Sequence, residues 1–269
     1  MRGVRERGPD LFALALIAVA VAGCSAGNID AIDLAPDALL EGLIAHWTFD
    51  ESPGATVAAD STANHHDGTV LPGTTWLPGE HFGGALHFTG NLTDSEVDVP
   101  MFPQPTASWS VAGWIRAPAG DTGDSYATIV STEIPGVGGW QLNLGLAPAV
   151  PTNPMNTVSL YQYAYSNGTG VTNGYIFKNC ECFVPDEWVH VAGIFDADNQ
   201  TISLYQNGKS SGSKPAAQTI LRGSDTLYFG RWQDPATRRL IGDLDDFVVY
   251  NRALTLPEIQ KLASAPLPP

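Results

Sequence analysis

Three alternating tyrosines are the residues whose chemistry points first to ligand binding. Tyr161, Tyr163 and Tyr165 form one stripe if their segment is an extended strand. Aromatic rings on an exposed sheet surface stack on sugar rings while their hydroxyl groups hydrogen-bond. Trp140 and Tyr175 are candidate partners at the rim of such a surface. The plainer alternative is that the stripe serves cross-strand packing, or that residues 166–185 cover it.

Two carboxylates share one face of another extended segment. Glu96 and Asp98 alternate with valines, a pattern typical of a polar outer face over an apolar inner face. Retaining glycoside hydrolysis needs two carboxyl groups about 5 Å apart. No serine-centred elbow or metal-binding histidine motif offers another catalytic route. We therefore predict no catalytic residues and no enzyme activity.

The cysteines indicate a compartment. Val21-Ala22-Gly23-Cys24 closes an apolar run that follows a basic start, as in a secretion signal, and the run is shorter than the roughly 20 residues of a membrane-spanning helix. The ending resembles the lipobox of bacterial lipoproteins. The resemblance implies cleavage before Cys24, acylation of Cys24 and attachment to the membrane through lipid. An ordinary cleaved signal is the alternative. Ser25 in the following position favours the outer membrane or cell surface.

The remaining two cysteines lie close together, at Cys180 and Cys182. A disulfide is the expected state in an oxidising compartment, although the ring it would close is small and strained. Free thiols and metal binding stay open as alternatives.

Composition excludes one class of partner. The chain of 269 residues carries a formal net charge of −15, with 13 basic and 28 acidic side chains, so nucleic acid would be repelled. Its 28 glycines and 20 prolines indicate many turns. The sequence does not specify an oligomeric state.

The elements that must position these residues are short strands. Apolar–polar alternation between turn-forming residues predicts an all-β sandwich or jelly roll. Thr255 and Glu258 form a capping-box pattern that predicts one short C-terminal helix. The expected strands are Ile44–Phe49, Ala85–Phe88, Glu96–Val99, Trp109–Arg116, Ala127–Thr132, Trp140–Leu146, Thr157–Tyr165, Trp188–Phe195, Thr201–Gln206, Thr226–Phe229 and Gly242–Tyr250.

The chain divides into four parts on this reading. Residues 1–23 form the signal peptide, and residues 24–42 the acylated cysteine with a flexible acidic spacer. Residues 43–263 form the folded domain, and residues 264–269 a proline-rich tail. The segments 147–156 and 166–185 resemble insertions at one rim.

Five segments, in order, resemble the laminin-G-like, concanavalin A-like jelly-roll family of bacterial surface proteins. They are Leu43–Glu51, Asp60–Thr69, Phe82–Phe88, the hairpin of Trp188–Ala192 with Thr201–Lys209, and Ile241–Leu254. The resemblance implies a concanavalin A-like two-sheet sandwich. Large apolar side chains would then anchor the core between the sheets: Trp47, Phe49, Trp114, Trp188 and Phe247.

The same resemblance implies a structural calcium site in some family members. The matching carboxylates are Asp50, Asp60, Asp245 and Asp246, with Asp245 favoured, because neighbouring residues of a regular strand point to opposite faces. Oxygen ligands of this kind suit calcium. Turn capping or solvent exposure is the plainer alternative.

The resemblance also bears on activity. Glucanases of this fold carry a Glu-x-Asp-x-x-Glu strand, whereas Met101 and Phe102 follow Glu96 and Asp98 here. We expect a lipid-anchored, non-catalytic module at the bacterial cell envelope that binds carbohydrate or another surface polymer. The alternatives are a glycan hydrolase with a degenerate catalytic strand and a structural envelope protein that binds another protein.

Overall fold

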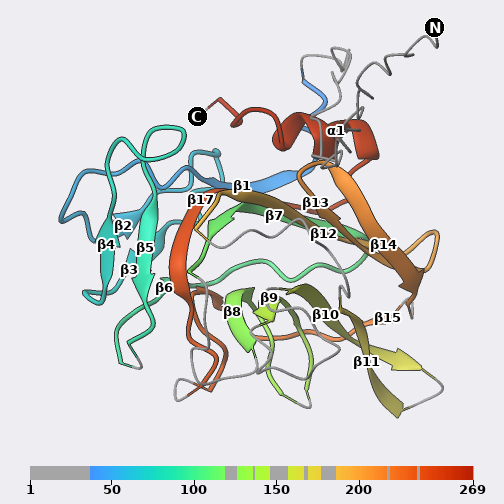
Figure 1. Ribbon diagram of the computed structural model, residues 1–269. Coiled ribbons are helices and arrows are strands. Elements are labelled where there is room, and N and C mark those ends of the chain that lie inside the picture. Colours follow the sequence, from blue (N-terminus) through green and yellow to red (C-terminus); the bar gives the residue numbers. More distant parts are fainter. Residues whose placement is uncertain are drawn as a thin grey trace, which may run out of the picture. The chain divides into compact units, whose positions relative to one another are not determined.

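Alternating burial along short strands stacks the chain into two antiparallel sheets, seen in a computed structural model (Figure 1). The structure describes residues 37–91, 93–118, 126–135, 137–145, 157–166, 169–176, 186–216, 219–234 and 237–268. They belong to one unit, residues 33–269, that is separate from residues 1–32. The predicted signal peptide, Cys24, Cys180 and Cys182 lie outside the described residues.

Sheet A has eight strands and sheet B has nine. The strands of sheet A are β1 (Leu43–Trp47), β4 (Thr74–Trp76), β5 (Leu86–Thr89), β7 (Trp109–Arg116), β12 (Val189–Asp196), β13 (Thr201–Gln206), β14 (Lys209–Pro215) and β17 (Ile241–Tyr250). The strands of sheet B are β2 (Val57–Ala58), β3 (Gly68–Val70), β6 (Val97–Val99), β8 (Tyr126–Ser131), β9 (Trp140–Gly145), β10 (Thr157–Ser166), β11 (Thr169–Ile176), β15 (Thr219–Ile220) and β16 (Leu227–Phe229).

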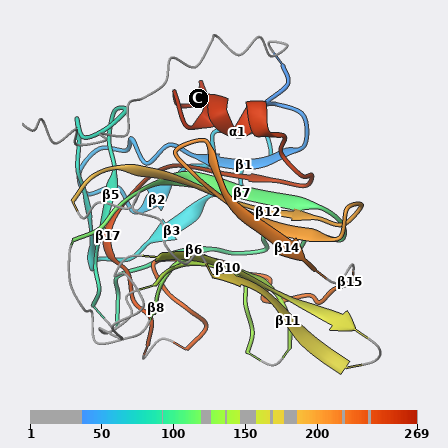
Figure 2. The ribbon, with the colours of Figure 1, turned by 45° about the vertical axis from the view of Figure 1, so that its right-hand side comes forward.

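The strand order departs from the chain order, as a jelly roll requires. Sheet A runs β14-β13-β12-β7-β17-β5-β4, with β1 also paired to β17; sheet B runs β11-β10-β9-β8-β16-β6-β3-β2, with β15 paired to β10. Figure 2 shows the sheets as two layers, with the helix α1 (Leu256–Leu262) on the outer side of sheet A. The outer face of sheet B is therefore the face turned away from α1. This arrangement confirms the predicted all-β sandwich with one short C-terminal helix.

Aromatic side chains fill the space between the sheets. Trp47, Phe49 and Phe247 are fully buried and each lies edge-on to Phe229, with ring centroids 5.1 to 5.5 Å apart. Edge-to-face contacts of this kind add stability beyond the area they bury. These three core anchors were expected from the sequence. Gly113 makes room for the Phe247 ring, since a Cβ at that position would lie 2.4 Å from it.

Two of the five expected anchors are not in that core. Trp114 and Trp188 are half-buried on the outer face of sheet A. The ring of His81 packs over both, with centroids 4.6 and 4.5 Å away. The expectation was wrong because side chains alternate along a strand: Trp114 lies between Gly113 and Ile115, which face inward, and Trp188 directly precedes Val189 of β12, which also faces inward.

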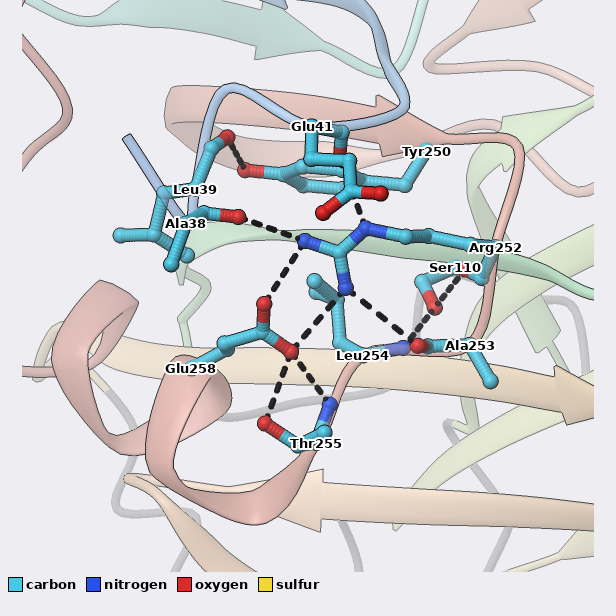
Figure 3. Close-up of polar contacts among 10 residues, drawn as sticks. All are labelled: Ala38, Leu39, Glu41, Ser110, Tyr250, Arg252, Ala253, Leu254, Thr255 and Glu258. Carbon is cyan, nitrogen blue, oxygen red and sulfur yellow. Dashed lines mark hydrogen bonds and ion pairs between the residues drawn. The ribbon is translucent and has the colours of Figure 1, made fainter. Parts of the chain in front are cut away.

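A second apolar cluster joins α1 to sheet A, and one arginine closes its end (Figure 3). Arg252 forms a bidentate ion pair with Glu258, at 2.7 and 3.0 Å, and donates to the carbonyls of Ala38 and Glu41. The hydroxyl group of Tyr250 donates to the Leu39 carbonyl at 2.9 Å. The chain therefore packs against the sandwich before Leu43, where the sequence alone places the start of the domain.

The capping box predicted for α1 is present: the Glu258 carboxylate accepts hydrogen bonds from the backbone N–H and the hydroxyl group of Thr255, both at 2.7 Å. Within the described part of the chain, no helix has the length and apolar character needed to cross a membrane.

Candidate functional site

The outer face of sheet B is polar, and strand alternation explains why. Val97 and Val99 of β6, Leu227 and Phe229 of β16, and Leu142 and Leu144 of β9 all lie in the core between the sheets. The residues between them must then occupy the opposite side of the sheet. We call this side the polar face, and its described members on the strands are Thr69, Asp98, Thr128, Ser131, Gln141, Asn143 and Tyr228.

Strand register joins these members into rows. Asp98 pairs with Tyr228, Tyr228 with Ser131, and Ser131 with Gln141, so one row crosses four strands. Thr128 and Asn143 pair directly in a second row. Residues that pair directly lie about 5 Å apart on one face, so the polar face is continuous although its members come from distant parts of the chain.

Several buried polar atoms on this face have no hydrogen-bond partner within the described part of the chain. They include the Oγ1 of Thr128, the Oε1 of Gln141, and both amide atoms of Asn143. Thr128 and Asn143 are fully buried, and Gln141 is 4% exposed. Buried polar groups in folded proteins are almost always hydrogen-bonded, because each unpaired one costs about 1–3 kcal/mol. These atoms are therefore the described groups on the face that a polar ligand or ordered water would satisfy.

Arginines and aromatic rings border the face at its β6–β16 end. Arg231 and Arg239 both contact the Glu96 carboxylate, with Arg231 Nε 3.2 Å from Glu96 Oε2. The Arg231 guanidinium also lies over the Tyr228 ring, 3.9 Å from its centroid. Arg238 covers the Trp232 ring in the same way, at 4.1 Å. The Tyr228 ring belongs to the row of polar side chains. The loop that carries Trp232 and Arg238 reaches the face, because the backbone N–H of Thr128 donates to the Arg238 carbonyl at 2.9 Å.

Asp98 is the more accessible of the two carboxylates. Its side chain is 35% exposed, while Glu96 is buried. Burial and the neighbouring Glu96 charge raise the pKa of Asp98, and the nearby Arg231 and Arg239 charges oppose that rise. The inner valines and outer acids follow the alternation predicted from the sequence. The outer acids do not simply face solvent, because arginines pair with Glu96.

The predicted ligand-binding aromatic residues have different positions. The register pairs Tyr161 with Gln141 and Leu160 with Leu142, which places residue 161 at a position of the polar face. The side chains of Tyr161, Tyr163, Tyr165 and Tyr175 lie outside those described, so their contacts stay a prediction. Trp140 is 1% exposed and stacks on Trp109, with centroids 4.5 Å apart. Its ring belongs to the core, so the expected rim position is wrong.

The four predicted calcium ligands are engaged separately. The Asp60 carboxylate accepts four hydrogen bonds, three from the backbone N–H groups of His46, Thr62 and His66 and one from the Thr62 hydroxyl group. This is the turn-capping role that the sequence left open. Asp50 is exposed, and burial and the Asp246 charge raise its pKa.

The other two each contact a histidine. Asp245 lies 2.7 Å from His81 Nδ1, and Asp246 lies 3.1 Å from His46 Nε2. Among the described residues, no three His, Cys, Asp or Glu side chains are placed to hold one metal ion. The arrangement does not fit a shared calcium ion, and calcium binding stays a prediction that these contacts do not support.

A β-bulge explains why Asp245 and Asp246 do not alternate. Register shifts between Asp245 and Val248, and Asp246 has a φ of +48°. Leu244 and Phe247 both reach the core, so both acids lie on the outer side of sheet A. The expectation that the pair points to opposite faces assumed a regular strand and is wrong here.

Around His81, the outer face of sheet A is a buried structural network. The fully buried His190 pairs with Trp114, and burial lowers its pKa to about 3, with a smaller effect from His81. Burial raises the pKa of Asp245 to about 6. This network lies beneath the ring of His81, so we assign it to folding rather than to ligand binding.

Sequence reasoning missed most of the polar face. The alternation Gln141-Leu142-Asn143-Leu144 was a usable signal, because a strand that alternates amides with leucines has one polar side. Arg231 and Trp232 gave no such signal, since they lie in a loop and reach the face only through the fold.

Comparisons with known proteins agree with this architecture. A family model described as the concanavalin A-like lectin/glucanases superfamily, Laminin_G_3, matches residues 89–260. No curated protein matches the chain. Among solved structures, domain 4 of AbnA, an extracellular GH43 arabinanase from Geobacillus stearothermophilus in complex with arabinotriose, is 21% identical with a TM-score of 0.59, over 82% of this chain and 98% of that one.

The binding domains of two toxins are also similar in structure to this chain. The binding domain of Paraclostridial Mosquitocidal Protein 1 is 18% identical, with a TM-score of 0.63 over 84% of this chain and 52% of that one. The receptor-binding domain of botulinum neurotoxin type G is 15% identical, with a TM-score of 0.60 over 83% and 51%. The chain thus spans about half the length of these toxin domains. At such identities the likeness concerns the fold. The family model covers more than half of the sequence, and the chain therefore belongs to the laminin-G-like branch of the concanavalin A-like lectin/glucanase superfamily.

Proposed function

We propose that this protein is a non-catalytic carbohydrate-binding module, held at the bacterial cell envelope by lipid on Cys24, with the polar face of sheet B as its ligand surface. The single observation that carries the proposal is the set of buried polar atoms without partners on that face, bordered by the rings of Tyr228 and Trp232. Sugar hydroxyl groups would satisfy such atoms, and aromatic rings would stack on the sugar.

The solved structures support a binding role. Domain 4 of AbnA holds arabinotriose, and both toxin structures are named as binding domains. The fold hosts many activities, so fold likeness alone is a weak warrant for function. The polar atoms on sheet B supply the chain-specific reason.

Absence of catalysis is part of the proposal. Glu96 is held by two arginines, and the position where the glucanase pattern has its second glutamate is Met101. Met101 lies beyond the end of β6, has a φ of +54° and is 83% exposed. This chain therefore offers only the first two carboxylates of the pattern, and one of them is committed to ion pairs.

The tyrosine stripe belongs to the same proposal. Because residue 161 pairs with Gln141, a stripe of Tyr161, Tyr163 and Tyr165 would extend the polar face along β10. Tyr175 of β11 pairs with Leu160, which pairs with the core residue Leu142, so position 175 falls on the side of the sheet opposite to the polar face and the expected rim position is not supported.

Binding is tested with the full chain on a glycan array, followed by titration calorimetry against the best ligand. We expect Asn143→Ala to weaken binding about tenfold, the effect of losing one or two hydrogen bonds. Thr75→Ala, an exposed change on sheet A, is the matched control and should leave the affinity unchanged. Absence of any glycan ligand would reject the proposal, and a ligand shortened during the titration would reject the non-catalytic part.

Lipid attachment is tested separately. Growth with a labelled fatty acid should label the protein, and Cys24→Ser should abolish both the label and its recovery with outer membranes. A Cys24→Ser protein that stays with the membrane fraction would argue for another mode of attachment.

A further inference from the structure

We infer that the ligand of the polar face is a neutral glycan rather than an acidic one. This inference rests on the proposed function and narrows it. It starts from the charges at the β6–β16 end of the face, where two acids face two arginines. Arg231 lies 3.2 Å from Glu96 and 3.9 Å from Asp98, and Arg239 contacts Glu96. The charges of Arg231 and Arg239, which an acidic sugar would need, are therefore already paired within the protein, and Arg238 lies over the Trp232 ring.

The remaining groups on the face carry no charge. Thr128, Gln141 and Asn143 offer hydroxyl and amide atoms, and the neighbouring Trp232 and Gln233 add an indole N–H and an amide oxygen. Together these atoms include both donors and acceptors without partners in the described residues. A sugar hydroxyl group donates and accepts, whereas a carboxylate only accepts. Neutral hydroxyl groups are therefore the better match to the set.

Asp98 adds a penalty against acidic ligands. Its Oδ1 atom has no hydrogen-bond partner among the described residues, and an ionised carboxylate can only accept one. A ligand hydroxyl group would donate to that oxygen, but a ligand carboxylate would repel it. Like charges brought together in an interface weaken binding. The formal net charge of −15 adds a long-range repulsion that acidic polymers would meet before contact.

The test compares ligands that differ only in charge. The full chain is titrated with cello-, xylo- and arabino-oligosaccharides of equal length, and with the same sugars after oxidation of their primary hydroxyl groups to carboxylates where they have them. We expect the neutral form to bind at least about tenfold more tightly. We also expect that ratio to narrow as ionic strength rises.

Two variants test whether the ratio of the two affinities depends on the polar face. Asp98→Asn should reduce the preference for the neutral form severalfold, because it removes the repelling charge, while Thr75→Ala should leave the ratio as in the wild type. Equal or tighter binding of the oxidised sugars would overturn this inference and leave carbohydrate binding intact. An Asp98→Asn ratio identical to that of the wild type would also overturn it. Failure of both ligand forms to bind would instead count against the proposed function.

Discussion

His190 should make the protein sensitive to acid, and the size of the effect follows from its burial. The imidazole is buried on sheet A beside Trp114, and its Nδ1 has no hydrogen-bond partner within the described residues. Burial lowers its pKa from 6.5 to about 3. Below pH 6.5 the imidazole of residue 190 binds a proton in the unfolded chain but stays neutral in the folded chain. The free energy of unfolding therefore falls as the pH falls.

The loss between pH 7 and pH 5 comes to about 2 kcal/mol, because each pH unit below the unfolded pKa contributes about 1.4 kcal/mol. Asp245 acts in the opposite direction. Burial raises its pKa to about 6, so the folded state gains a proton in the same interval and becomes about 1 kcal/mol more stable. The wild type should therefore lose only about 1 kcal/mol in total.

Replacing His190 separates the two effects. The variant His190→Gln has no titrating group at this position, so acidification from pH 7 to pH 5 should stabilise it by about 1 kcal/mol where the wild type is destabilised. Urea unfolding followed by tryptophan fluorescence measures both. His65→Gln, a change at an exposed histidine, is the matched control. Equal pH dependence in His190→Gln and the wild type would refute a buried, neutral His190.

Three further changes test packing and polar contacts, each by urea unfolding. Gly113→Ala should cost about 1–3 kcal/mol, since its Cβ would lie 2.4 Å from the Phe247 ring; an unchanged midpoint would mean that the ring moves freely. Arg252→Ala should cost about 3 kcal/mol, because it leaves the buried Glu258 carboxylate without its bidentate partner, and Arg252→Lys should recover only part. Asp60→Ala should cost at least about 2 kcal/mol, as several N–H groups lose their acceptor; a loss no larger than for an exposed aspartate would contradict that role.

The general architecture was predictable because strand alternation is a local property. Each strand expected from the sequence has a counterpart, and the hairpin at Asn207-Gly208 forms with φ values of +46° and +71°. Those angles are the ones for which Asn-Gly is favoured in tight hairpins. The short strands β2, β3, β4 and β15 were missed, since two or three residues are too few for alternation to be read. The longer strands β11 and β14 were missed as well: β11 lies within the segment 166–185 that was expected to be an insertion, and β14 is a polar segment without apolar alternation.

Bulges and covering loops were not predictable in the same way. The bulge in β17 turns Asp245 and Asp246 to the same side, yet the local sequence is compatible with a regular strand. The His81 ring covers Trp114 and Trp188 only because its loop crosses sheet A. Such contacts join residues that are far apart in the chain, and a pattern within one segment carries no information about them.

The polar face could be predicted only in part from patterns within single strands. Asp98 and Tyr228 are neighbours through the pairing of β6 with β16, which no single segment reveals. Each strand nevertheless marks its own polar side, so the candidate residues were visible one strand at a time. Alternation does not show which polar residues have hydrogen-bond partners inside the fold.

The two outer faces of the sandwich differ in the buried polar groups that they carry. Around sheet A, Asp60, Asp245 and Asp246 each contact protein groups, and these contacts hold turns and strands together. On sheet B, Thr128 and Asn143 are as deeply buried but have no described partner for their side-chain atoms. Burial of polar atoms costs stability unless something binds them. Among the described residues, His190 Nδ1 and Asp245 Oδ1 on sheet A also lack a hydrogen-bond partner, but they lie in the network beneath the His81 ring. The unpaired hydroxyl and amide atoms on sheet B instead follow paired rows of neighbouring strands, and a ligand rich in hydroxyl groups would satisfy them.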